Sequence, residues 1–313
     1  MNIVLLDAKT LGNSNLHGLA KLGRLSIYQT TFKKDIIARC KDADIILTNK
    51  VVLDSAILAK LPKLKLICIT ATGMNNVDLE AAKNLKIAVK NVANYSTATV
   101  AQHTFACVLN LMAKMDYYDK FVKKGKWAKS PTFDHLSDYH ELYELHGKSW
   151  GIIGFGNIGK AVANLAVAFG ANVVYFSTSG KNNDKKFKRE KDLKALFKGC
   201  DIISIHAPLN ESTRNLVTKK ELRLLKKDAI LANMGRGGIV NEVDLANVIK
   251  KRDFYFAADV LEIEPMMKNH PLLNKKIRDK ILLTPHIAWA YKESRERLIR
   301  GVEDNIRAFL KGK

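Results

Sequence analysis

Lys148-Ser-Trp-Gly-Ile-Ile-Gly-Phe-Gly-Asn-Ile-Gly159 is the stretch of this sequence that decides the fold. A short apolar run ends in Gly154, Gly156 and Gly159, and a segment with helical apolar periodicity follows from 157 to 169. Gly154 allows a tight turn, Gly156 lets the backbone approach a pyrophosphate, and Gly159 lets the helix pack on the strand. The pattern predicts a strand, a turn and a helix whose N-terminus faces phosphates, which is typical of dinucleotide-binding sites.

Strand-like and helical segments alternate on both sides of this stretch. Downstream strands are predicted over 170–176, 201–206, 229–233, 254–260 and 281–284, with helices between them. Upstream strands are predicted over 3–7, 25–29, 43–48, 64–70 and 87–92. A long apolar helix is expected over 100–115, and we interpret its single histidine, His103, as structural. This alternation indicates α/β units with parallel, doubly wound sheets, whose ligands bind beyond the carboxyl ends of the strands.

Composition places the chain among ordinary globular proteins. Its 313 residues exceed one typical core, so two domains are expected. The 52 Lys and Arg residues outnumber 31 Asp and Glu, which gives a net charge of +21. The excess is spread over segments such as 185–191 and 219–227, so we interpret it as solvated surface and expect no nucleic-acid partner.

The remaining global features point to a reducing compartment. The four cysteines are far apart in mostly apolar surroundings and are predicted to be buried thiols, and no metal pattern is present. The N-terminal run 1–7 lacks a basic region and is interpreted as a strand. No apolar segment approaches the ~20 residues of a membrane span. We therefore expect a cytoplasmic protein with no membrane partner.

Three polar side chains follow three successive strands of the second half: Arg236, Glu264 and His286. The carboxyl edge of one parallel sheet would bring them together. Singly, each has a plain structural explanation, as a surface arginine, a helix-start carboxylate or a loop histidine. Together, beside a dinucleotide site, they indicate an acid/base centre, because only histidine titrates unperturbed near neutrality.

Taken together, these segments resemble the D-isomer-specific 2-hydroxyacid dehydrogenases along essentially the whole length of the chain. The motifs that carry the resemblance are Gly154-Phe-Gly-Asn-Ile-Gly159, His206-Ala-Pro-Leu-Asn-Glu-Ser-Thr213, Asn233-Met-Gly-Arg-Gly-Gly238, Asp259-Val-Leu-Glu-Ile-Glu-Pro265 and Thr284-Pro-His-Ile-Ala-Trp289. The resemblance implies a flavodoxin-like substrate domain formed by 1–96 and 291–313. It further implies a Rossmann cofactor domain over 97–290 and a homodimer.

The same resemblance assigns roles to residues. Arg236 would hold the substrate carboxylate and carbonyl, His286 would be the general acid/base, and Glu264 its partner, favouring the imidazolium form. The loop with Thr72, Gly73 and Met74 would grip the carboxylate through N–H groups, while Trp289 would favour a small side chain. The residues expected to line the cofactor are Thr99, Gly154, Phe155, Gly156, Asn157, Ile158, Gly159, Ser177, Thr178, Ser179, Lys181, His206, Ala207, Pro208, Thr213, Asn233, Met234, Gly235, Asp259, His286 and Ala288.

Cofactor preference stays open at this stage. NAD-specific Rossmann domains usually carry an acid about 20 residues past the glycines, whereas this chain reads Tyr175-Phe-Ser-Thr-Ser-Gly-Lys181 there. The hydroxyls and the ammonium suit a 2′-phosphate, which would make NADP(H) the cofactor. The alternative is a loop that accepts NAD(H) and NADP(H) alike.

The expected reaction is reduction of hydroxypyruvate or glyoxylate to D-glycerate or glycolate by NAD(P)H, because the ending 284–289 resembles glycerate dehydrogenases and hydroxypyruvate or glyoxylate reductases. One alternative is another 2-hydroxy acid such as D-lactate. Another is a dinucleotide-sensing, corepressor-like interaction protein without catalysis. The basic, aromatic segment of about 116–146, which contains Trp127, His135 and His140, is interpreted as a dimer-contact arm.

Overall fold

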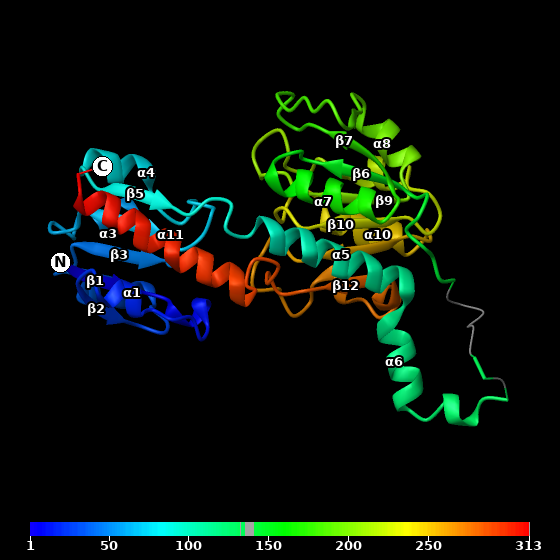
Figure 1. Ribbon diagram of the computed structural model, residues 1–313, viewed down its shortest axis with the longest axis horizontal. Helices are drawn as coiled ribbons and strands as arrows, with labels where there is room; N and C mark the ends of the chain where they lie inside the picture. The colour runs from blue at the N-terminus through cyan, green and yellow to red at the C-terminus, as the bar shows by residue number, and fades with distance from the viewer. Residues whose placement is uncertain (132, 135–140, 313) are drawn as a thin grey trace. The chain divides into compact units, whose positions relative to one another are not determined.

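The computed structural model describes residues 1–131, 133–134 and 141–312, so His135 and His140 lie outside the described residues. The chain divides into two compact units, one formed by residues 1–96 with 289–313 and the other by residues 97–288 (Figure 1). No helix among the described residues is long and apolar enough to cross a membrane.

The first unit is a five-stranded parallel sheet with helices on both faces. Its strands, in the spatial order β2-β1-β3-β4-β5, are β2 (Arg24–Ile27), β1 (Asn2–Leu5), β3 (Ile45–Thr48), β4 (Leu66–Ile69) and β5 (Ala88–Asn91). Its helices are η1 (Ala8–Leu11), α1 (His17–Ala20), η2 (Lys33–Asp35), α2 (Ile36–Cys40), α3 (Ser55–Leu58), α4 (Leu79–Asn84) and α11 (Lys292–Leu310). This order is the flavodoxin-like one.

Alternation of buried side chains along each strand explains the two helical layers of this unit. Val4 and Leu6 pack with α2, α3 and α4 on one face of the sheet. Ile3 and Leu5 pack with α1 and α11 on the other, because successive strand residues point to opposite faces. The helix α11 (red in Figure 1) thus completes a unit that otherwise comes from the first 96 residues.

The second unit contains a seven-stranded parallel sheet. Its strands, in the spatial order β12-β11-β10-β9-β6-β7-β8, are β12 (Ile281–Leu283), β11 (Tyr255–Ala258), β10 (Ile230–Asn233), β9 (Ile202–Ile205), β6 (Ser149–Ile153), β7 (Asn172–Phe176) and β8 (Lys188–Arg189). Its helices are α5 (Thr97–Ala113), α6 (Met115–Lys123), η3 (Trp127–Lys129), α7 (Asn157–Ala168), α8 (Leu193–Gly199), α9 (Lys219–Leu222), α10 (Glu242–Ile249), η4 (Pro271–Leu273) and η5 (Arg278–Lys280).

Helices cover both faces of this second sheet as well. The helices α5 and α7 share one core with Trp150 and Ile152, while α8, α9 and α10 share another with Ile153 and Ile203. The strand order reverses between β6 and β9, which is where a doubly wound sheet opens a crevice for ligands at its carboxyl edge. The predicted fold class, a Rossmann unit with a smaller flavodoxin-like unit, is confirmed.

One local expectation, the end of the long helix, is wrong. The long helix ends at Ala113 and not at 115, because Lys114 adopts a left-handed conformation (φ 52°) and buries its ammonium 3.3 Å from the centre of the Tyr255 ring. The lysines of the basic run 185–191 are exposed, as expected, although the run also contains the edge strand β8 and Phe187, which packs edge-on against Phe155. The prediction of four buried free cysteines is confirmed.

Candidate active site

Three loops at the carboxyl edge of the second sheet pack backbone against backbone. They follow β6, β9 and β10 and meet at Ala207. A Cβ added to Gly154 would lie 2.6 Å from the Ala207 nitrogen, and one added to Gly235 would lie 2.8 Å from the Ala207 oxygen. Gly154 also has a φ of 88°, which an L side chain rarely adopts. Glycine is therefore required on both sides of Ala207, and the floor of the crevice is made of main chain.

The turn from β6 into α7 fits a dinucleotide phosphate. Gly156 is the N-cap of α7, no side chain caps it, and a Cβ added there would meet nothing within 4 Å. Gly159 instead faces the Gly154 carbonyl so closely that a Cβ would collide with it. Open space in front of an uncapped helix N-terminus is what an anionic pyrophosphate requires. Phe155 is fully buried and stacks on Tyr175 at 3.9 Å, so only its backbone faces the crevice.

His286 and Glu264 form a direct pair beyond β12 and β11. The His286 Nδ1 atom lies 2.6 Å from Oε2 of Glu264, and both side chains remain partly exposed. The other carboxylate oxygen of Glu264 accepts from the Leu261 N–H at 3.0 Å, which fixes its direction. Because Nδ1–H donates to Glu264, Nε2 of His286 is the nitrogen left for proton exchange with a bound molecule.

Arg236 lies beyond β10 in a turn held by its neighbours. Its Nη1 donates to the Gly235 carbonyl at 2.8 Å, and its own carbonyl accepts from the Asn233 side chain at 2.9 Å. The next residue, Gly237, packs so tightly on the Leu261 carbonyl that a Cβ would collide with it. The turn of Arg236 therefore contacts the loop that orients Glu264. Arg236 is exposed in an otherwise buried run, with most of its guanidinium donors available.

Asp259 holds the loop that carries His286. Its carboxylate accepts from the N–H groups of Ile287 and Ala288, each at 2.8 Å, and its carbonyl accepts from the His286 N–H at 2.8 Å. The loop needs this support because His286 has a φ of 55°. Asp259, expected to line the cofactor, thus uses its carboxylate to position the histidine.

A hydrogen-bond chain that the sequence did not predict extends this support. The Thr284 hydroxyl donates to Asp259 at 2.6 Å, and its oxygen lies 3.0 Å from Nε2 of His103 on α5. Burial lowers the pKa of His103, against a smaller opposite effect of the Asp259 carboxylate. A neutral His103 donates to Thr284, which therefore donates onward to Asp259. Nothing in the sequence pairs these residues, because 181 positions separate His103 from Thr284.

Replacing Thr284 by valine tests this chain. We expect Thr284→Val to lower the free energy of unfolding by about 1–3 kcal/mol, because the buried Asp259 carboxylate loses a donor while the side-chain shape is kept. Denaturant unfolding measures the change. Thr30→Val, at an exposed threonine of the first unit, is the control and should leave stability within about 0.5 kcal/mol. Equal stability of the two variants would contradict the network.

Other residues expected near the cofactor act through the loops they shape. The Thr213 hydroxyl donates to the Pro208 carbonyl at 2.7 Å and closes the loop after β9. The Asn233 side chain accepts from the Gly235 N–H at 3.2 Å as well as donating to the turn of Arg236. Burial lowers the pKa of His206 to about 3, and its Nδ1 has no hydrogen-bond partner among the described residues. A neutral, unsatisfied nitrogen at this edge is suited to a polar ligand.

The remaining cofactor-site predictions divide by burial. Three of them are buried and expose little of their surface: Thr99, Met234 and Ala288. Those at the rim with exposed or half-buried side chains are Asn157, Ile158, Thr178, Ser179 and Lys181. Ser177 is buried at the end of β7, where its oxygen accepts from the Asn182 N–H at 3.3 Å.

The predicted substrate residues Thr72, Gly73, Met74 and Trp289 lie in the first unit. The Thr72 hydroxyl is bound to the Val92 carbonyl at 3.1 Å, so it is committed within the unit. Among the described residues, the N–H groups of Gly73 and Met74 have no hydrogen-bond partner. Trp289 packs edge-on against Tyr95 at 6.3 Å between ring centres.

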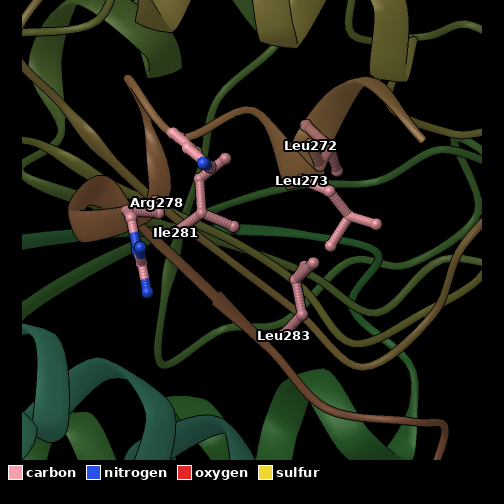
Figure 2. A pocket seen from close by; sticks show the side chains of 6 residues that line it. Leu272, Leu273, Arg278, Ile281 and Leu283 are labelled. Carbon is pink, nitrogen blue, oxygen red and sulfur yellow. The ribbon is translucent and has the colours of Figure 1, made fainter. Parts of the chain in front are cut away.

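Cavities occur elsewhere on both units. One of about 420 Å³ lies beside the edge strand β12 and is lined by Lys275 and by the five residues that Figure 2 labels, Leu272, Leu273, Arg278, Ile281 and Leu283. Another of about 360 Å³ lies at the carboxyl edge of the first sheet, near Asp7 and Lys50. Neither is lined by Arg236, Glu264 or His286.

Comparison with known proteins agrees with this geometry. A family model described as the NAD binding domain of D-isomer specific 2-hydroxyacid dehydrogenases matches residues 105–288. The chain is 35% identical to a hydroxypyruvate reductase of Blautia hydrogenotrophica, covering 100% of this chain and 98% of the relative. It is 36% identical to a glyoxylate reductase of Aeropyrum pernix, covering 91% and 85%.

Solved structures with the same fold match the whole chain. The D-lactate dehydrogenase of Aquifex aeolicus, complexed with NAD and lactic acid, superposes with a TM-score of 0.84 at 27% identity, covering 100% of this chain and 96% of that one. An acyclic imino acid reductase in complex with NADPH and D-Arg superposes with a TM-score of 0.87 at 28% identity, covering 100% and 98%. The two complexes differ in dinucleotide and in bound acid.

Proposed function

Because the chain belongs to the D-isomer-specific 2-hydroxyacid dehydrogenase family, a family of NAD(P)-dependent oxidoreductases, we propose that it reduces hydroxypyruvate or glyoxylate to D-glycerate or glycolate. The observation that carries this proposal is the 2.6 Å pair of His286 and Glu264 at the carboxyl edge of a dinucleotide-binding sheet. Relatives named for these two substrates support the choice of a small 2-oxo acid.

His286 is the proton donor in this proposal. Glu264 accepts from Nδ1–H and orients the ring, so Nε2–H can donate to the substrate carbonyl oxygen as negative charge develops there. In the reverse direction, neutral Nε2 accepts the hydroxyl proton. The bound dinucleotide supplies or accepts the hydride at the carbonyl carbon. Asp259 keeps the ring in place by holding the backbone on both sides of it.

Arg236 binds the substrate carboxylate. One of its five donors is used by the Gly235 carbonyl, which leaves the rest of the planar fork for a bidentate contact. In the first unit, we assign the N–H groups of Gly73 and Met74, which have no partner among the described residues, to binding a carboxylate, with the Thr72 side chain holding their loop. Trp289, half-buried against Tyr95, limits the size of the substrate side chain.

The second unit holds the dinucleotide and the first unit binds substrate. The N-terminus of α7 would hold the phosphates in front of Gly156, because no side chain caps it and a Cβ on Gly156 would meet nothing within 4 Å. The loops with Ala207 and Gly235 form the floor, and the unsatisfied Nδ1 of His206 supplies a further contact. The four buried thiols support a reducing compartment, and we infer the cytoplasm.

One assay tests the reaction. Absorbance of the reduced nicotinamide is followed with hydroxypyruvate and with glyoxylate, using NADH and NADPH in parallel, and pyruvate and a bulky 2-oxo acid serve as comparison substrates. Rapid oxidation with the two small substrates is the expected result. Preference for the bulky acid would contradict the substrate, and no oxidation by protein that binds either dinucleotide would favour a dinucleotide-sensing protein.

We propose a homodimer on the basis of the segment after α5. None of the nine residues of α6, all of them described, is buried, and Met115 is 61% exposed. Trp127 and Phe133 continue the apolar surface and are 49% and 88% exposed. Exposed aromatic side chains gathered on one segment are typical of interfaces. We assign this segment to contact with a second copy of the chain.

Light scattering tests the dimer. The wild-type protein should have twice the mass of the chain, and the double variant Met115→Asp/Trp127→Asp should shift to monomer, because each new charge would be buried without a partner at the interface. Lys120→Asp, at an exposed α6 residue, is the control and should remain dimeric. A monomeric wild-type protein would contradict the assignment.

A further inference from the structure

The edge strand β8 brings an arginine to the end of β7. The two strands are parallel, and Arg189 pairs in register with Tyr175, two positions before Ser177. The chain leaves β7 in a turn in which the Gly180 N–H donates to the Ser177 carbonyl at 3.2 Å. A Cβ added to Gly180 would lie 3.8 Å from Nη2 of Arg189. The guanidinium therefore reaches the turn that follows the second strand of the dinucleotide fold.

Arg189 makes no ion pair with any residue that the structure describes. Its Nε is buried and has no hydrogen-bond partner among the described residues. The two acidic residues of the surrounding segment pair with lysines: Asp184 with Lys160 at 3.3 Å and Glu190 with Lys188 at 2.6 Å. A buried charged donor without an acceptor is costly, so a ligand that supplies one would bind strongly.

The turn itself offers donors and no acid. Ser177 accepts from the Asn182 N–H, which leaves its hydroxyl proton to donate, and Lys181 is exposed beside it. No Asp or Glu occurs from Ser177 to Asn183. In this fold the end of the second strand is where the adenosine ribose is recognised, by an acid for a free 2′-hydroxyl or by a cation for a 2′-phosphate.

We propose that Arg189, together with Ser177 and Lys181, binds the 2′-phosphate of NADP(H) and makes it the preferred cofactor. A phosphate matches the planar fork of a guanidinium and satisfies its donors, whereas the 2′-hydroxyl of NAD(H) leaves them unpaired. The inference rests on the proposed function only in requiring that the second unit bind a dinucleotide. It decides between the two alternatives left open by the sequence, a loop that prefers NADP(H) and a loop that accepts NAD(H) and NADP(H) alike.

Calorimetric binding of 2′,5′-ADP and of ADP tests the proposal without substrate. The wild-type protein should bind 2′,5′-ADP about 30-fold more tightly than ADP, and Arg189→Gln should reduce that ratio to about 3-fold or less while leaving ADP binding unchanged. Arg189→Lys, which keeps the charge but not the fork, should retain part of the preference. Lys185→Gln, an exposed lysine of the same basic run, is the matched control and should keep the wild-type ratio.

Kinetics give an independent readout. Arg189→Gln should raise the KM for NADPH by about 30-fold and change the KM for NADH by less than about 3-fold. Equal wild-type affinities for the two nucleotides, or equal weakening of both by Arg189→Gln, would overturn the 2′-phosphate site. Binding of neither nucleotide would overturn the dinucleotide assignment itself. Tight nucleotide binding with no substrate turnover would leave this site supported and contradict only the proposed reaction.

Discussion

His286→Gln is expected to lower kcat by roughly 10³-fold while leaving dinucleotide affinity unchanged. Glutamine can still donate toward Glu264, but it cannot carry a proton to the carbonyl oxygen. Cofactor affinity should persist because the phosphate turn at Gly156 is separate from this side chain. Turnover is measured by nicotinamide absorbance and affinity by calorimetry.

A second variant at His286 is needed to separate the loss of the proton donor from a disturbance of the loop backbone. Its φ of 55° suits histidine and asparagine better than glutamine, so His286→Gln could also disturb the loop. His286→Asn tolerates the left-handed conformation and should lose the same activity. Full activity in either variant would remove His286 from the mechanism, and equal inactivity with normal thermal unfolding would assign the loss to the missing proton donor.

Arg236→Gln should lower kcat/KM by roughly 10³-fold, mainly by raising KM for the 2-oxo acid, because the carboxylate loses its charged, bidentate partner. Arg236→Lys keeps the charge and should recover only a small part of the loss. Steady-state kinetics over a range of hydroxypyruvate concentrations provide the measurement.

Arg214, an exposed arginine close to the turn of Arg236, provides a matched control. Arg214 has a side-chain nitrogen 3.5 Å from the position of a Cβ on Gly238, and it pairs with Glu262 at 3.1 Å on the exposed surface. Arg214→Gln removes the same charge nearby and should change kcat/KM by less than about 3-fold, since an exposed ion pair contributes little. Similar losses in both variants would indicate a general electrostatic effect and contradict a specific contact of Arg236.

Much of the second unit could be predicted because its chemistry requires particular residue types at short range. Gly154 and Gly159 sit where main chain approaches main chain, and no other residue would fit at Gly154. His286 and Glu264 follow predicted strands, so the parallel sheet alone predicted that they meet. Their pair at 2.6 Å agrees with that prediction.

What could not be predicted depends on contacts between distant parts of the chain. The strand β8 has two residues, both basic, so it has no alternation that would distinguish it from a solvated run. Lys114 ends α5 early because its ammonium lies on Tyr255, which no local pattern reveals. His103 is structural, as its position in an apolar helix suggested, but its link to Asp259 through Thr284 appears only in the folded chain.

The close approach of three loops at Ala207 has a consequence for changing selectivity. The contact between these loops leaves no room for a side chain, because a Cβ on Gly154 or Gly235 would come within 3 Å of main-chain atoms of Ala207. Substitutions there would expand the main chain and alter every contact above it. Redesign toward another dinucleotide or another acid therefore has to act outside this contact, at exposed or half-buried residues of the second unit such as Arg189 and Arg236. The packing of the three loops around Ala207 can therefore be kept while substitutions at the more exposed residues change which ligands bind.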